Sequence, residues 1–233
     1  KLLRAEAGDD GRCELPLLHT AGGLVGGDQL SIDLNLKAES RSLITSVAAQ
    51  KVYGSVGRSR LNPDGAWSRQ GVTCTLDDNS DLEWLPQEMV LYADALFHQS
   101  LRVCLPENAS FLSAEIVRLG RTAAEERLNQ GCWRSCLEIQ RHGADSPRWE
   151  LVDRLELGGS SLTDCHGLAG APVFGSLVWA APKPLSPEAI SMLLKDARDD
   201  RHGLIGTMRC STLDQGLVAR YICLLYTSDA ADE

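Results

Sequence analysis

The sequence predicts a mainly β protein, a large antiparallel or mixed β-sheet scaffold with one or two α-helices. Two observations carry this prediction. Apolar and polar residues alternate along several segments, which is typical of half-buried strands. Clusters of Gly, Pro, Asn and Asp separate these segments, as turns do. Because many strands joined by short turns favour pairing between neighbours, we expect mainly antiparallel sheets in a sandwich or related stack.

The clearest strand is 29–38, where Leu30, Ile32, Leu34 and Leu36 fall on one face and polar residues on the other. The other predicted strands are 40–49, 71–78, 100–107, 136–143 and 149–159. Turn signals lie at 62–65, 77–81, 106–108 and 158–159.

One helix is expected over 186–198. Ser186 can cap it, Pro187 suits the first helical position, and apolar residues follow at helical spacing: Ile190, Leu193, Leu194 and Ala197. A second, weaker helical candidate is 120–131, which has a glycine at each end. Without a long linker or a fixed-period repeat, the sequence favours one domain over 1–221. Residues 222–233 change character abruptly and are expected to be a non-native tail.

Composition and charge exclude several classes of protein. The chain has 32 acidic against 23 basic residues, a formal net charge of −9, so nucleic acid is an unfavourable partner. No apolar run approaches 18 residues, so we expect no membrane span. Eight scattered cysteines without a secretory signal predict reduced, mostly buried thiols in a cytoplasmic protein.

The stretch LLHTAGGLVGGDQLSI, residues 17–32, has four glycines in six residues. It lacks the lysine of a phosphate-binding loop, and a strand follows it rather than a helix. We expect a tight connection into a strand near Gln29 that places Asp28 near the interior or a channel mouth.

No catalytic motif stands out: H-E-x-x-H, C-x-x-C and G-x-S-x-G are all absent. One enzymatic alternative is a metal-dependent hydrolase using Cys165, His166 and one carboxylate. A further alternative is a plain β structural module, which predicts that the acidic residues face solvent.

Three carboxylates lie in otherwise apolar segments. Glu83 and Glu88 flank Trp84 in DLEWLPQEMVLYADA, and Glu115 lies within FLSAEIVRLGR. A carboxylate in an apolar strand must be paired, exposed or functional. Arg118 and Arg121 are candidate partners for a structural ion pair with Glu115.

Several motifs occur in order: TAGGLVGGDQLSIDL, ITSVAAQKVYGS, LEWLPQE, EIVRLGR followed by EERLNQG, and GLVARY. In these the chain resembles the UreD family of urease accessory proteins, called UreH in some organisms, over about residues 15–221. The resemblance implies a non-enzymatic, β-rich scaffold that binds UreF, and through UreF the GTPase UreG. It also implies docking on apo-urease and nickel delivery to the urease active site, with a tunnel proposed as the route.

For this chain, the resemblance implies no stable metal site and no tightly bound cofactor, only nickel in transit. Asp28, Glu83, Glu88 and Glu115 become candidate transient nickel contacts, since nickel accepts oxygen ligands. The chain departs from the family in one acidic run. Family members usually carry Phe-Asp-Gly-Ala where this chain has Tyr92-Ala93-Asp94-Ala95, a shift that on a strand would reverse the face of the acid. N-terminal strands and a segment after residue 221 are expected to be missing.

Overall fold

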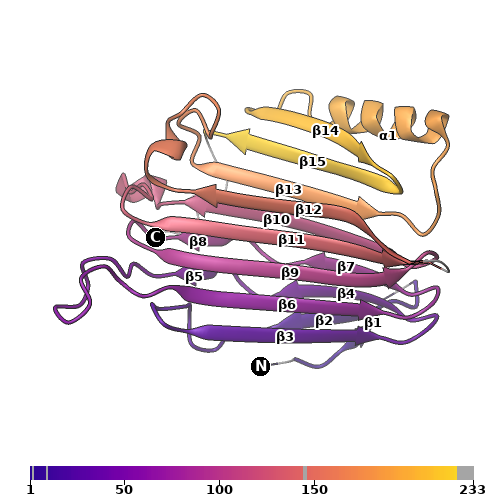
Figure 1. Cartoon of the computed structure of the whole chain (residues 1–233), viewed down its shortest axis with the longest axis horizontal. Helices are drawn as coiled ribbons and strands as arrows, with labels where there is room; N and C mark the ends of the chain where they lie inside the picture. The colour runs from indigo at the N-terminus through magenta and orange to yellow at the C-terminus, as the bar shows by residue number, and fades with distance from the viewer. Residues whose placement is uncertain (2, 9, 144–145, 225–233) are drawn as a thin grey trace.

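The computed structural model describes residues 1–224 except residues 2, 9, 144 and 145. These residues form two β-sheets stacked face to face, with one α-helix beside the last strands (Figure 1). The large sheet contains β1 (Glu6–Ala7), β2 (Cys13–Leu17), β4 (Arg41–Ser46), β5 (Gln50–Val52), β7 (Asp81–Leu85), β8 (Met89–Leu91), β10 (Ser110–Leu119), β13 (Val173–Ala180), β14 (Thr207–Leu213) and β15 (Gly216–Cys223). The small sheet contains β3 (Gln29–Leu36), β6 (Ser68–Leu76), β9 (Leu96–Pro106), β11 (Cys132–His142) and β12 (Pro147–Leu157).

The mainly β class and the mixed sheets are confirmed, but the expected dominance of antiparallel pairing is wrong. Of the thirteen strand pairings within the described residues, eight are parallel. The reason is the path of the chain, which runs from β3 through the large sheet to β6, and again through the large sheet to β9. The strands β3, β6, β9 and β11 of the small sheet are therefore successive passes in one direction, whereas β11 and β12 pair antiparallel.

The six predicted strand segments coincide with β3, β4, β6, β9, β11 and β12. The strands β1, β2, β5, β7, β8, β13, β14 and β15 were not predicted. The last of them includes Ile222 and Cys223, which pair with Phe174 and Val173. The rest of the expected tail, residues 225–233, lies outside the described residues.

The expected helix is present as α1 (Pro187–Asp200), and Ser186 Oγ caps it by accepting from Ala189 N at 3.2 Å. The helical prediction for 120–131 is wrong, because that segment contains only a short 3₁₀ turn, η1 (Thr122–Ala124). Glu125 ends the turn with a φ of +57°, and Leu128 is fully buried while the alanines of the turn are exposed. A single buried side chain gives no apolar stripe to support a longer helix. A second 3₁₀ turn, η2 (Gly159–Leu162), follows β12.

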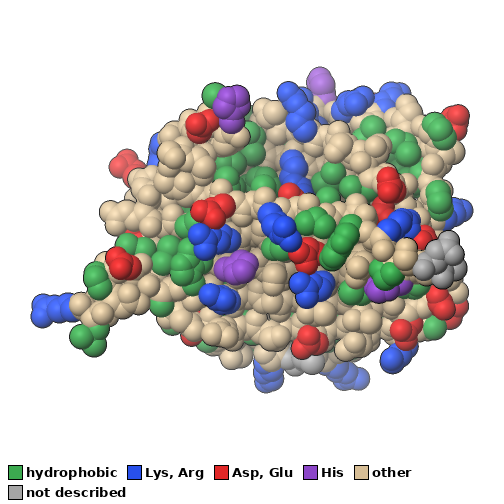
Figure 2. All heavy atoms as spheres, viewed as in Figure 1, with side chains coloured by type: hydrophobic (Ala, Val, Ile, Leu, Met, Phe, Trp, Pro, Cys, Tyr) green, Lys and Arg blue, Asp and Glu red, His purple; other side chains and the backbone are tan. Residues whose placement is uncertain are grey.

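The space between the sheets holds two apolar clusters, one toward each end of the strands. On β9, for example, Phe97 belongs to one cluster and Val103 to the other. In the first cluster Trp133 packs edge-on against Phe174, with ring centroids 5.6 Å apart. The outer face of the small sheet is solvated and carries charges of both signs among apolar side chains (Figure 2).

The cysteines differ from expectation, because only Cys74 and Cys223 of the eight are buried. No helix among the described residues has the length and apolarity needed to span a membrane.

Candidate functional site

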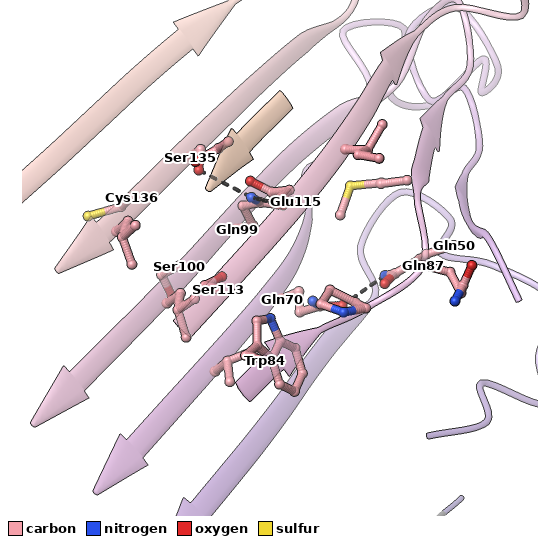
Figure 3. Close-up of a pocket in the computed structure, with 17 residues that line it drawn as sticks. Gln50, Gln70, Trp84, Gln87, Gln99, Ser100, Ser113, Glu115, Ser135 and Cys136 are labelled. Carbon is pink, nitrogen blue, oxygen red and sulfur yellow. Dashed lines mark hydrogen bonds between the residues drawn. The ribbon is translucent and has the colours of Figure 1, made fainter. Parts of the chain in front are cut away.

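A row of polar side chains separates the two apolar clusters between the sheets. We call this row the polar belt; it consists of Gln50, Gln70, Gln99, Ser113, Glu115, Ser135, Asp153, Ser176 and Arg220. Figure 3 shows its central part, with Gln99, Glu115 and Ser135 close together and Gln50 beside Gln70.

Strand register brings the belt to one level. In the small sheet Gln70 lies beside Gln99, which in turn lies beside Ser135 on β11. In the large sheet Glu115, Ser176 and Arg220 form the corresponding row on β10, β13 and β15. Because side chains alternate along a strand, each of these residues points inward in line with the apolar side chains before and after it.

Gln99 and Glu115 form the central contact of the belt. Gln99 Nε2 donates to Glu115 Oε1 and also to Ser135 Oγ at 3.1 Å. Gln99 Oε1 is buried and has no hydrogen-bond partner among the described residues. A buried acceptor without a donor is costly, so this oxygen is suited to a water molecule or a cation.

Burial raises the pKa of the Glu115 carboxyl group above its ordinary value, while the Gln99 hydrogen bond and the Arg220 charge act in the opposite direction. The surface that Glu115 retains borders an internal cavity of about 50 Å³. That volume is enough for about three water molecules, and polar groups line it.

The cavity adjoins a gap in the large sheet. Residues 47–49 separate β4 from β5, and residues 86–88 separate β7 from β8. Both breaks lie at the level of the belt, since β7 pairs with β10 up to Ser113 and β8 pairs with β10 from Val117 onward. Glu115 therefore lies in the part of β10 that neither β7 nor β8 pairs with.

A second cavity of about 260 Å³ lies beside the first, with Gln50, Gln70, Trp84 and Pro86 lining both. Its other lining residues include His19, which is exposed, and Lys51. The two cavities are thus neighbours, the second bordered by the exposed His19 and the first by Glu115. The hydrogen bond of 2.8 Å from Gln50 Nε2 to Gln70 Oε1 lies where they meet.

The glycine run is a turn, as predicted. Gly22 and Gly27 have φ values of +77° and +97°, and between them Leu24 is buried and forms a parallel bridge with Val52. Asp28 is partly buried, and its Oδ2 accepts from Val25 N at 2.9 Å. The carboxylate of Asp28 therefore closes this turn, and Asp28 is not among the residues that line either cavity.

Glu83 and Glu88 lie away from the belt. Glu83 follows the inward-facing Leu82 and precedes the inward-facing Trp84, so it points to the outer face, where it pairs with Arg12 at 2.5 Å. Glu88 lies in the break before β8, and its backbone oxygen accepts from Gln50 N. Of the four predicted carboxylates, the structure brings Glu115 to the cavity and leaves Asp28, Glu83 and Glu88 outside its lining.

The expected partners of Glu115 make other contacts. Arg118 donates to Thr122 Oγ1, and Arg121 pairs with Glu126. Asp94 lies in a turn after β8 rather than on a strand, so the expected reversal of its face does not apply; it pairs with Arg58 at 3.0 Å.

The hydrolase alternative finds no support in the geometry. Cys165 and His166 are exposed in the segment after η2, where His166 N donates to Asp164 Oδ1. Among the described residues no group of three or more His, Cys, Asp or Glu side chains could hold a metal ion.

The belt residues Gln70, Gln99 and Ser135 were missed by the sequence analysis. A signal was present, because each is a polar residue at an inward position of an alternating strand. The inward side of β9, for instance, reads Phe97, Gln99, Leu101, Val103. Each interruption alone resembles a chance polar residue; the register between strands is what aligns them.

The comparisons with known proteins give the family. The model of the family described as "UreD urease accessory protein" matches residues 1–224. A protein named urease accessory protein UreD from Parasynechococcus marenigrum (strain WH8102) is 79% identical over 221 residues, covering 95% of this chain and 71% of the relative. Proteins of the same name from Synechococcus sp. (strain CC9605) and Prochlorococcus marinus (strain NATL1A) are 69% and 52% identical, covering 95% and 91% of this chain and 71% and 69% of the relatives. The chain therefore belongs to the UreD family of urease accessory proteins.

Proposed function

We propose that this chain is a scaffold for nickel delivery to urease, and that the polar belt carries nickel in transit. In this proposal it works in the cytoplasm, binds UreF and through it the GTPase UreG, and docks on apo-urease. The family membership makes the chain an accessory protein and not an enzyme. The single observation that carries the nickel route is Glu115, a carboxylate held between the sheets and beside a cavity.

The sizes of the two cavities support a stepwise loss of water. The outer cavity, about 260 Å³, has room for an ion with much of its water shell. The inner cavity, about 50 Å³, is too small for a full shell of about six waters. Side-chain oxygens must replace part of the shell there, and Glu115 and Gln99, which line this cavity, carry carboxylate and amide oxygens.

The donor set suits transit rather than storage. Carboxylate, amide and hydroxyl oxygens bind nickel less tightly than clustered thiolates or imidazoles, so the ion can leave again. The plain structural module, by contrast, predicts solvent-facing acids, and the position of Glu115 between the sheets argues against it.

Co-purification tests the scaffold role. The complete protein, tagged and co-expressed with UreF, UreG and apo-urease, is expected to retain all three and to depend on UreF for retaining UreG. Nickel added to the isolated assembly should then activate the urease. Failure to retain UreF or urease would contradict the scaffold role.

A further inference from the structure

Arg220 lies at the far side of the belt from the gap in the large sheet. It occupies the same row as Glu115, with Ser176 of β13 between them. Its Nη1 donates to Ser176 Oγ at 2.7 Å, and its Nη2 pairs with Asp153 on β12. The pair connects the two sheets where the small sheet ends, because β12 is the last strand of that sheet.

The belt contains one arginine and two carboxylates, Glu115 and Asp153, so its formal charge is −1. An arginine stays protonated even when it is desolvated, so this positive charge is permanent. A cation next to Glu115 is repelled by the fixed positive charge of Arg220 in the same row. Asp153, the next carboxylate along the belt, is already paired with Arg220.

Both side chains of the pair reach the solvent. Arg220 and Asp153 are each about a quarter exposed, at 25% and 26%. The long arginine side chain can therefore turn toward solvent, and the carboxylate would then be open to another cation.

We propose that Arg220 is a tethered cation that gates the belt: an ion passing beyond Glu115 must displace the Arg220 guanidinium from Asp153. This inference rests on the proposed nickel route and adds the residues that control its far side. A structural alternative is that the Arg220–Asp153 ion pair only holds the two sheets together.

Nickel affinity of the complete protein in complex with UreF separates the two alternatives. Equilibrium dialysis with Ni²⁺ alone is the measurement. Arg220→Gln keeps hydrogen-bonding capacity and removes the repelling charge, so nickel should bind about tenfold more tightly. Asp153→Asn leaves the arginine charge without its carboxylate, so nickel should bind about tenfold more weakly.

A gate therefore predicts opposite changes in nickel affinity for Arg220→Gln and Asp153→Asn. If the ion pair only holds the two sheets together, both variants should lower the melting temperature and leave the nickel affinity unchanged. That result would overturn the proposal. Since each variant makes its own signed prediction, either one decides the matter if the other does not fold. Arg220→Lys, which keeps the charge, should behave like the wild type.

A Glu115→Gln background separates this proposal from the proposed function. In this background both changes in nickel affinity, from Arg220→Gln and from Asp153→Asn, should be smaller, because the ion that Arg220 repels is the one that Glu115 binds. If Glu115→Gln binds nickel as the wild type does, the route itself fails, and the gate fails with it. If Glu115→Gln loses nickel but Arg220→Gln and Asp153→Asn match the wild type, only the gate is wrong.

Discussion

Gln99 and Glu115 face each other across the two sheets, and the Gln99 amide donates to the Glu115 carboxylate (Figure 3). The contact joins β9 of the small sheet to β10 of the large sheet at the level where β7 and β8 are interrupted. It holds a carboxylate inside the protein beside space for water, which is an unfavourable arrangement for stability alone.

Glu115→Gln should therefore stabilise the protein at neutral pH. Burial raises the pKa of Glu115, so its contribution to stability is present below the ordinary carboxyl pKa and is lost as the pH rises through the raised value. Each unit of that rise corresponds to about 1.4 kcal/mol. Thermal unfolding of the complete protein at pH 4.5 and pH 7.5 should show the gain at pH 7.5 and little difference at pH 4.5. A loss at pH 7.5 would mean that the charge of Glu115 is stabilising.

Gln99→Leu should impair nickel delivery while leaving the assembly intact. The change removes the donor to Glu115 and replaces an amide that lines the cavity with an apolar group. Thr73→Leu is the matched control, since Thr73 is exposed on the outer side of neighbouring β6. Urease activation should fall roughly tenfold for Gln99→Leu and stay normal for Thr73→Leu, at equal recovery of the UreF complex. Equal activation by both variants would remove Gln99 from the route.

Arg141→Met should destabilise the fold by about 3–5 kcal/mol, because it removes the closer of the two arginines that pair with the buried Glu150, the other being Arg148 at 3.6 Å. Arg141 and Glu150 are fully buried and 3.0 Å apart, and the arginine also donates to four backbone oxygens: those of Pro106, Glu107, Ala109 and Ala181. Arg102→Met is the control, because Arg102 is 64% exposed in its pair with Glu138 and should cost at most about 1 kcal/mol. Urea unfolding measures both; equal losses would contradict the burial argument.

Gly26→Ala should be more damaging than Gly22→Ala. A Cβ at Gly26 would lie 2.2 Å from Ser55 Oγ, and that hydroxyl is held by hydrogen bonds to Ala66 O and from Ala66 N. Overpacking of this kind costs about 1–3 kcal/mol before the hydrogen bonds are counted. At Gly22 the space is open and the cost is the positive φ alone, about 1–2 kcal/mol. Comparable melting temperatures for the two variants would show that Ser55 can move aside.

Local pattern located six of the fifteen described strands and predicted the wrong direction for most strand pairings. The alternation over 29–38 and the cap at Ser186 are local properties, and β3 and α1 formed where expected. Parallel pairing of β3 with β6 depends on a chain path through the other sheet, which no local period records. Glu115 was identified from the sequence as an acid among apolar residues. Gln99 could be recognised as its partner only from the structure, because the contact depends on how the two sheets pack.

Urease activation by Glu115→Gln tests the central claim most directly. The variant keeps the shape of the side chain and its contact with Gln99, and Glu83→Gln provides a matched control on the outer face of the same sheet. Each is measured in the complete protein, with activation normalised to the recovered complex with UreF and apo-urease. The nickel route through the belt predicts a loss of tenfold or more for Glu115→Gln and near-normal activation for Glu83→Gln, a difference of about 1.4 kcal/mol or more. Normal activation by Glu115→Gln at equal complex recovery would contradict it.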